Sequence, residues 1–410
     1  MLFPLTAWAG ITPAPPAPLG THIDGNDELC ITSAFSVDRR YIVQVSRDLD
    51  KWEDHYLSPF KDKGEGLKVR QLGEYAPERE YYRVGVLPWT FQSVDTSGDW
   101  IGNTSMSRLP EGGTAFVFQN RDKNELYYGE VTADSETPEI ARIVGTGVED
   151  EPGHWDNSGY TDVTLQIDPS GSPWIVCMDD HAEEMILLRK RPDTGGWKRT
   201  VILSGLDSPY WAFPKFAISQ QGRMGIVYRG NDGSYLALSS ISSPAVWTHR
   251  KISPLSPHNA YETGIVFNLA GGLIVQADDA FSVNGTTGEI SPIQLSGQLQ
   301  CRTGADGSLI TMGRSFDGTM ISRSVDGGVI WISSYAERLS YDDAAVSIDC
   351  DSEGRLSLFR PPALYRQLTP GGPWHRTAMR GGAVHQSDAA GRIRLLMVEY
   401  DGEFSLVTED

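Results

Sequence analysis

Apolar and polar residues alternate through the last three quarters of the chain, in a unit that recurs about every 45 residues. Clear copies of the unit begin at Tyr160, Tyr210, Tyr261 and Tyr341. Each copy runs from an aromatic residue through an alternating stretch, a glycine turn and a second apolar stretch that ends in a charge. Alternation with period two predicts β-strands, and a repeat of this length predicts a β-propeller whose copies are four-stranded blades.

The repeat predicts an all-β fold with a seven-bladed propeller over residues 88–410, and six or eight blades are the alternatives. Tryptophans mark the outer strands of three blades, at Trp197, Trp247 and Trp374. A matching segment at Trp89 stands before the first blade, whereas the last repeat has room for only three strands. We therefore expect residues 88–95 to supply the missing strand and to close the ring, which leaves no long unpaired edge.

The first 87 residues lack the repeat. Residues 22–87 predict a separate small β-module of four or five strands divided by turns. Residues 1–21 contain Ala7-Trp8-Ala9, a small-x-small pattern like a signal-peptidase site, followed by a proline-rich stretch. We interpret this segment as the remnant of a secretion signal, with a disordered tail as the alternative, and expect a secreted or cell-envelope bacterial protein.

Charge and composition exclude several classes of function. The formal net charge is −19, and no basic run exists to neutralise phosphates, so we expect no nucleic-acid partner. No apolar stretch is long enough to span a membrane. The four cysteines lack metal-ligand spacing; we expect buried thiols, with a Cys301–Cys350 pair as the alternative. No cofactor or resident metal is expected, and the protein is expected to be a monomer.

One segment resembles a known sequence motif. Ser324-Val325-Asp326-Gly327-Gly328-Val329-Ile330-Trp331 is similar to the Asp-box, S-x-D-x-G-x-T-W, of sialidases and related (BNR-repeat) propellers, with Ile330 in place of threonine. The resemblance implies a hairpin turn that marks the fold rather than a catalytic site. The first arginine of the sialidase motif is replaced by Thr104, and no acid/base aspartate follows Arg121 at the family spacing. The resemblance therefore does not imply an ordinary sialidase.

In a propeller, the loops that enter the inner strands and those that leave the second strands emerge on one face, at the mouth of the central channel. The repeat places three sets of candidate residues there. The aromatic set is Tyr160, Tyr210, Trp211, Tyr261 and Tyr341, the arginine set is Arg121, Arg229, Arg314 and Arg360, and the carboxylate set is Asp162, Glu262 and Asp342.

These residue types suit a glycan that carries acidic groups. Aromatic rings stack on the C–H face of a sugar, and guanidinium forks bind carboxylate or sulfate in a two-pronged manner. Structural alternatives exist for both sets: each arginine could pair with an aspartate of the neighbouring blade, and each tyrosine could pack between blades. We therefore predict a glycan or polysaccharide as the partner, bound at the channel mouth.

Three functions remain open at this stage. A glycoside hydrolase would need two carboxylates across the bond, drawn from Asp162, Glu262 and Asp342, and is preferred. The chain also resembles propeller enzymes that act on uronic-acid polysaccharides, and a lyase of that kind would use His154 with Tyr160 as its acid/base pair. The third possibility is a non-catalytic propeller that binds a glycan or a protein.

Overall fold

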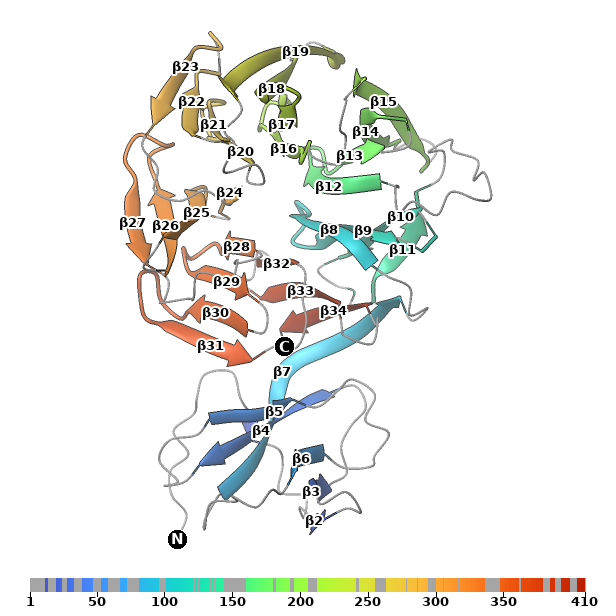
Figure 1. The fold of residues 1–410 in the computed structure, drawn as a ribbon, viewed down its shortest axis with the longest axis vertical. Coiled ribbons are helices and arrows are strands. Elements are labelled where there is room, and N and C mark those ends of the chain that lie inside the picture. Colours follow the sequence, from blue (N-terminus) through green and yellow to red (C-terminus); the bar gives the residue numbers. More distant parts are fainter. Residues whose placement is uncertain are drawn as a thin grey trace.

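The structure of the protein is a computed structural model in which all the regular structure described is β-strand. The described residues are 12–13, 20–23, 28–32, 39–46, 53–57, 67–71, 81–95, 101–120, 122–123, 125–132, 135, 137–143, 160–179, 182–191, 195–205, 212–240, 243–254, 263–277, 279–285, 287–293, 300–304, 306–315, 318–335, 347–360, 363–378, 384–387, 392–398 and 404–409. Seven antiparallel sheets, each contributing four strands, surround a common centre (Figure 1). The prediction of a seven-bladed β-propeller is confirmed.

The two inner layers of the ring follow the chain from blade 1 to blade 7. The innermost strands are β8 (Ile101–Arg108), β12 (Tyr160–Ile167), β16 (Lys215–Ile218), β20 (Gly264–Phe267), β24 (Gln300–Thr303), β28 (Ser347–Cys350) and β32 (Val384–Ser387). The second strands are β9 (Thr114–Asn120), β13 (Pro173–Asp179), β17 (Met224–Gly230), β21 (Leu273–Gln276), β25 (Leu309–Ser315), β29 (Leu356–Arg360) and β33 (Ile393–Val398).

The two outer layers complete each blade. The third strands are β10 (Glu125–Val131), β14 (Glu184–Lys190), β18 (Gly233–Ser240), β22 (Ala280–Val283), β26 (Gly318–Ser324), β30 (Ala363–Gln367) and β34 (Phe404–Glu409). The outermost strands are β11 (Glu139–Arg142), β15 (Trp197–Ser204), β19 (Ser243–Pro254), β23 (Ile290–Ile293), β27 (Ile332–Tyr335), β31 (Trp374–Ala378) and β7 (Tyr81–Asp95). Trp197, Trp247, Trp374 and Trp89 all lie on outermost strands, as the repeat predicts.

The strand β7 closes the ring. It pairs with β34 from Glu409 opposite Trp89 to Phe404 opposite Asp95, so the start of the propeller completes its last blade. Across the closure, the rings of Phe118 and Phe404 lie 4.8 Å apart, which packs blade 1 against blade 7. Closure by a strand from the other end of the repeat removes the unpaired edge that β34 would otherwise present.

The same strand also belongs to the N-terminal unit. There β7 pairs with β4 (Arg39–Ser46) and β1 (Thr12–Pro13), and β5 (Glu53–Leu57) extends the sheet. A second sheet contains β2 (Gly20–Ile23), β3 (Glu28–Thr32) and β6 (Leu67–Gln71). In Figure 1, β7 runs as one strand from this unit into the ring. The expected boundary at residues 87/88 thus falls inside a strand: the β4–β7 register shifts around Pro88, since proline donates no backbone hydrogen bond and is tolerated at a bulge.

The glycine of the repeat ends a turn between the inner and second strands. In blade 2, Gly171 has a φ of 84°, in the left-handed region that favours glycine, and its amide donates to the carbonyl of Asp168 over 2.9 Å. The Asp168 carboxylate accepts from the backbone amides of Ser170 and Ser172 and from Trp174 Nε1, each over 2.9 Å. Ser219, Asn268 and Asp351 begin the corresponding turns of other blades, so one turn chemistry recurs around the ring.

The hydrophobic core is a ring of clusters between neighbouring blades. Between blades 2 and 3, for example, Trp174, Val176 and Leu187 pack against Phe216 and Tyr228. Comparable clusters join blade 1 to blade 2, blade 3 to blade 4, blade 4 to blade 5, blade 5 to blade 6 and blade 7 to blade 1, and many of their members are fully buried. Sheets that pack face to face around a centre leave their inner edges free, and these edges form the wall of the channel.

The Asp-box-like segment forms the turn that its sequence suggests. The Asp326 carboxylate accepts from Ser324 Oγ over 2.7 Å and from the amide of Ile330 over 2.9 Å, and Trp331 Nε1 donates to the carbonyl of Gly328 over 3.0 Å. Trp331 packs on the cluster between blades 4 and 5. The turn lies between β26 and β27, and its residues do not line the central cavity.

Candidate functional site

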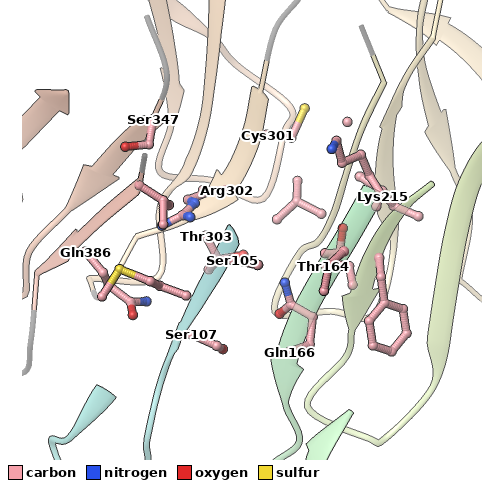
Figure 2. Close-up of a pocket in the computed structure, with 18 of the residues that line it drawn as sticks. Ser105, Ser107, Thr164, Gln166, Lys215, Cys301, Arg302, Thr303, Ser347 and Gln386 are labelled. Carbon is pink, nitrogen blue, oxygen red and sulfur yellow. The ribbon is translucent and has the colours of Figure 1, made fainter. Parts of the chain in front are cut away.

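The inner strands surround a cavity of about 620 Å³ along the centre of the ring (Figure 2). All seven innermost strands contribute residues to its lining. Small-molecule sites commonly have volumes of roughly 300–1,000 Å³, so this channel can hold a saccharide-sized group. It is therefore the candidate functional site.

The lining forms two layers because side chains two residues apart on a strand lie on the same side. The pairing registers align the inner strands of the seven blades. The first layer contains Ser105, Thr164, Lys215 and Ser347, and the second contains Ser107, Gln166, Arg302, Asp349 and Gln386.

The lining hydroxyls join one blade to the next. Ser105 Oγ accepts from the backbone amide of Leu165 over 3.0 Å, and Ser107 Oγ accepts from the amide of Ile167 over 3.2 Å. Thr164 Oγ1 donates to the carbonyl of Pro214 over 3.2 Å. Inner strands of different blades do not share a sheet, so these bonds satisfy backbone groups that would otherwise face the channel unpaired.

Ser347 and His385 resemble a nucleophile and its base, since Ser347 Oγ is hydrogen-bonded to His385 Nδ1. His385 is fully buried, and its burial lowers its pKa to about 3, so the imidazole is neutral and a weak base. Its Nε2 lies 2.9 Å from Ser357 Oγ. Ser347 Oγ also accepts from the His385 amide over 3.1 Å, which is the blade-joining bond that Ser105 makes to Leu165. The pair is therefore structural.

Asp349 is the only carboxylate among the described residues that line the cavity, and its Oδ2 accepts from two donors. Its Oδ2 accepts from Arg108 Nη2 over 2.6 Å and from the amide of Ser387 over 2.6 Å. Arg108 Nε donates in turn to the carbonyl of Ser387 over 2.7 Å. This network ties β8, β28 and β32 together next to the ring closure, and it fixes the position of the Asp349 carboxylate.

Two further cations reach the cavity with weaker partners. Figure 2 shows Lys215 and Arg302 projecting into it from opposite sides. Arg302 Nη1 is 3.5 Å from the carbonyl of His385 and 4.0 Å from Asp349 Oδ1, both long for a hydrogen bond. Among the described residues, none forms a hydrogen bond or an ion pair with the Lys215 ammonium. Burial lowers the pKa of Lys215, and the charge of Asp162 opposes this effect.

Asp162 is one of the two predicted site residues whose side chains the structure describes. It lies in a bulge of β12, where the register shifts between Thr161 and Thr164, and its φ of 52° is unusual for a residue other than glycine. Phe213 has a φ of 41° and occupies the equivalent position in blade 3. It stands two residues before Lys215, just as Asp162 stands two residues before Thr164. The backbone thus bends at the start of both inner strands, and the charge of Asp162 acts on Lys215.

Arg229 is the other predicted residue with a described side chain. Its amide donates to the carbonyl of Ala212 over 2.8 Å, which places it beside the start of the inner strand of blade 3. It is one strand away from the channel and does not contribute to the cavity lining. In blade 2, Tyr160 pairs with Asp179, so starts of inner strands and ends of second strands do share one face.

The remaining predicted residues divide into two groups. The backbones of Tyr160, Arg314 and Arg360 lie in β12, β25 and β29. The other eight lie outside the described residues: Arg121, His154, Tyr210, Trp211, Tyr261, Glu262, Tyr341 and Asp342. Their roles stay predictions.

Sequence reasoning missed the cations of the channel, Arg108, Lys215 and Arg302. A signal was present, because each is a lone basic residue within a short inner strand of otherwise uncharged residues. The repeat by itself does not reveal it, since the repeat shows where strands begin and end but not which inner-strand side chains face the centre.

At the end of β13, Asp179 pairs with Arg199 Nη2 over 3.1 Å. Over the part of the chain that the structure describes, no cluster of three or more metal-ligating side chains occurs. Within the same part, no helix of the length and hydrophobicity that a membrane crossing requires is present.

No family model and no curated protein matches this chain. Among solved structures, an oligogalacturonate lyase from Vibrio parahaemolyticus matches with a TM-score of 0.45 and 8% identity, covering 76% of this chain and 98% of that chain. A protein of unknown function from Dyadobacter fermentans matches with a TM-score of 0.44 and 11% identity, covering 78% and 99%. A polysaccharide lyase matches with a TM-score of 0.40 and 11% identity, covering 96% and 89%.

Proposed function

We propose that the protein binds an acidic glycan in its channel and cleaves it there, with hydrolysis as the preferred reaction. The charge of the lining supports the proposal. Among the described residues, three cationic side chains, Arg108, Lys215 and Arg302, share the cavity with one carboxylate, Asp349, in a chain whose net charge is −19. A local cationic excess in a low-dielectric channel attracts an anion, and the surrounding hydroxyl and amide groups suit sugar hydroxyls.

The residues at the channel mouth would complete this site. In the sequence, Tyr210 and Trp211 stand shortly before Lys215, and Tyr261 stands shortly before Gly264. We propose that these rings, with Tyr341, stack on sugar rings as they enter. The arginines Arg121, Arg229, Arg314 and Arg360 would contact acidic groups outside the cavity.

Hydrolysis would use Asp162 together with Glu262 or Asp342. The position of Asp162 supports a catalytic role, because the residue lies at the start of β12 and its charge acts on Lys215 in the channel. Glu262 stands two residues before Gly264, as Asp162 stands two residues before Thr164, so the repeat gives both carboxylates the same place in their blades. Two carboxylates that flank a glycosidic bond provide the acid and the base or nucleophile of the reaction.

Elimination is the second candidate, and the cationic lining favours it. A uronate loses the proton beside its carboxylate more readily when cations stabilise the negative charge that develops there. Lys215 and Arg302 could provide this stabilisation, and His154 with Tyr160 would transfer the protons. Elimination does not require a second carboxylate.

Product analysis by mass spectrometry tests the proposal with a panel of acidic and neutral glycans. Fragments that carry one added water establish hydrolysis, and Asp162→Asn should then lower the rate by about 100-fold or more. Glu111→Gln, in an exposed turn at the other end of blade 1, should leave the rate unchanged. Fragments with an unsaturated end favour elimination. Binding without fragments indicates a non-catalytic glycan-binding propeller. If no glycan is bound and no fragments form, the proposed function is overturned.

A further inference from the structure

We propose that Lys215 and Arg302 form a carboxylate-binding site inside the channel, separate from the residues at its mouth. Where the carboxylate belongs to a glycan, this inference rests on the proposed function and specifies which group of the glycan enters the channel. Where it is a free carboxylate, the site stands on its own.

The two side chains belong to one cavity although they come from different blades. Lys215 begins β16 in blade 3, and Arg302 lies on β24 in blade 5. Between them, blade 4 places Gly264 and Val266 at the equivalent lining positions, so no acidic side chain separates the two cations there. Figure 2 shows both cationic groups directed into the space that a ligand would occupy.

Neither cation has a close acidic partner within the described lining. Asp349 is 4.0 Å from Arg302 but is held at 2.6 Å by Arg108 and at 2.6 Å by the Ser387 amide. Lys215 has only the electrostatic influence of Asp162 from blade 2. Charges that are withdrawn from bulk water and left without a close partner are costly, and an anionic ligand between them would offset that cost.

The chemistry of the lining favours a carboxylate with hydroxyl groups. The planar fork of Arg302 matches the two oxygens of a carboxylate, and Lys215 supplies a point charge with three donors. Gln386 Oε1 is buried at the cavity wall without a hydrogen-bond partner, and it can accept from a ligand hydroxyl. A sugar acid has both kinds of group, whereas acetate has only the carboxylate.

Calorimetric titration and thermal unfolding at constant ionic strength test the site with three probes: glucuronic acid, neutral glucose and acetate. The variants are Lys215→Met, which removes the charge at similar length, and Arg302→Gln. The matched control is Lys198→Met, an exposed lysine on β15 outside the channel. We expect glucuronate to bind the intact protein and the control equally, and each channel variant about tenfold or more weakly.

Each outcome separates the site from the proposed function. If acetate raises the Tm of the intact protein but not that of Lys215→Met, a free carboxylate is sufficient; if only glucuronate does so, the carboxylate must be carried on a sugar. Acetate binding without any saccharide binding supports the site and contradicts the proposed function. Glucuronate and glucose binding that is unchanged in both channel variants overturns the site while glycan recognition stands. A lack of any carboxylate effect on the intact protein also overturns it.

Discussion

At the scale of single residues, the channel is governed by the cost of placing charges inside a protein. Arg108 and Asp349 meet this cost by pairing at 2.6 Å, with the backbone of Ser387 completing the network. Lys215 has no such partner among the described residues, and its burial lowers its pKa against the opposing charge of Asp162. An unpaired cation in the wall of a channel reduces the stability of the fold and is retained where it serves a ligand.

Lys215→Met should therefore raise the Tm at neutral pH, by roughly 1–3 °C. A lysine whose pKa is lowered by folding reduces the free energy of unfolding. This reduction is complete below the folded pKa and disappears as the pH rises past the unfolded value of about 10.4. The gain in Tm should shrink accordingly toward about pH 10. Thermal scans from neutral to alkaline pH measure this, with exposed Lys198→Met expected to show no such gain. A lower Tm of Lys215→Met at neutral pH would mean that the ammonium has a strong partner.

At the scale of elements, the turn between the inner and second strands is the recurring unit of the blade. Asp168 satisfies the amides of Ser170 and Ser172 and the indole of Trp174. Burial by itself raises the pKa of Asp168, but the hydrogen bonds from Ser170, Trp174 and Ser172 outweigh it and lower the pKa. The ionised carboxylate thus stabilises the native turn.

Asp168→Ala should lower the free energy of unfolding by about 1–2 kcal/mol at neutral pH, because two backbone amides and one indole lose their acceptor. A lowered carboxyl pKa contributes stability that is complete above the unfolded value of about 3.9 and is lost as the pH falls through the folded pKa. The difference between the variant and the intact protein should therefore narrow in acid. Urea unfolding at about pH 7 and about pH 3 tests both statements.

The control for this experiment is Glu111→Ala. Glu111 is an exposed carboxylate in the corresponding turn of blade 1, and removing it should change the stability by less than about 0.5 kcal/mol. Equal effects of the two substitutions would show that loss of negative charge, rather than loss of the turn bonds, is responsible.

At the scale of the whole molecule, stability depends on the closed ring. Blade 7 obtains its outermost strand from β7, more than three hundred residues earlier in the chain than its partner β34. Neighbouring blades share their hydrophobic clusters, including the cluster of Phe116, Phe118 and Phe404 between blades 1 and 7. Opening the ring would therefore expose both the edge of β34 and part of that core.

Two deletions distinguish closure from the contribution of the N-terminal unit. A protein without residues 1–80 keeps β7 and should unfold in one transition, with a Tm close to that of the full chain. A protein without residues 1–95 loses β7 and should unfold at a clearly lower temperature or aggregate. Circular dichroism during heating and size-exclusion chromatography provide the measurements. Similar behaviour of the two proteins would show that the strand at 89–95 does not hold the ring closed.

The sequence by itself determined the architecture, because the features that specify a blade are local. Alternation with period two, the glycine of the turn at Gly171 and its equivalents, and the outer-strand tryptophans are all visible within one repeat. Even the closure followed from the missing fourth strand of the last blade and the spare segment at Trp89. The expectation that the starts of inner strands and the ends of second strands share one face also came from the repeat, and the pairing of Tyr160 with Asp179 agrees with that geometry.

Only the tertiary structure decided which residues line the channel and what their charges meet. Arg108 pairs with Asp349, which lies 241 residues away in the sequence, and Lys215 shares a cavity with Arg302 from two blades away. Such partnerships depend on the register of each strand and on how the blades pack, which no single repeat contains. The continuity of β7 through Pro88 also depends on tertiary structure. Before Pro88 the strand pairs with β4, and after it the strand pairs with β34, so partners on both sides keep it extended.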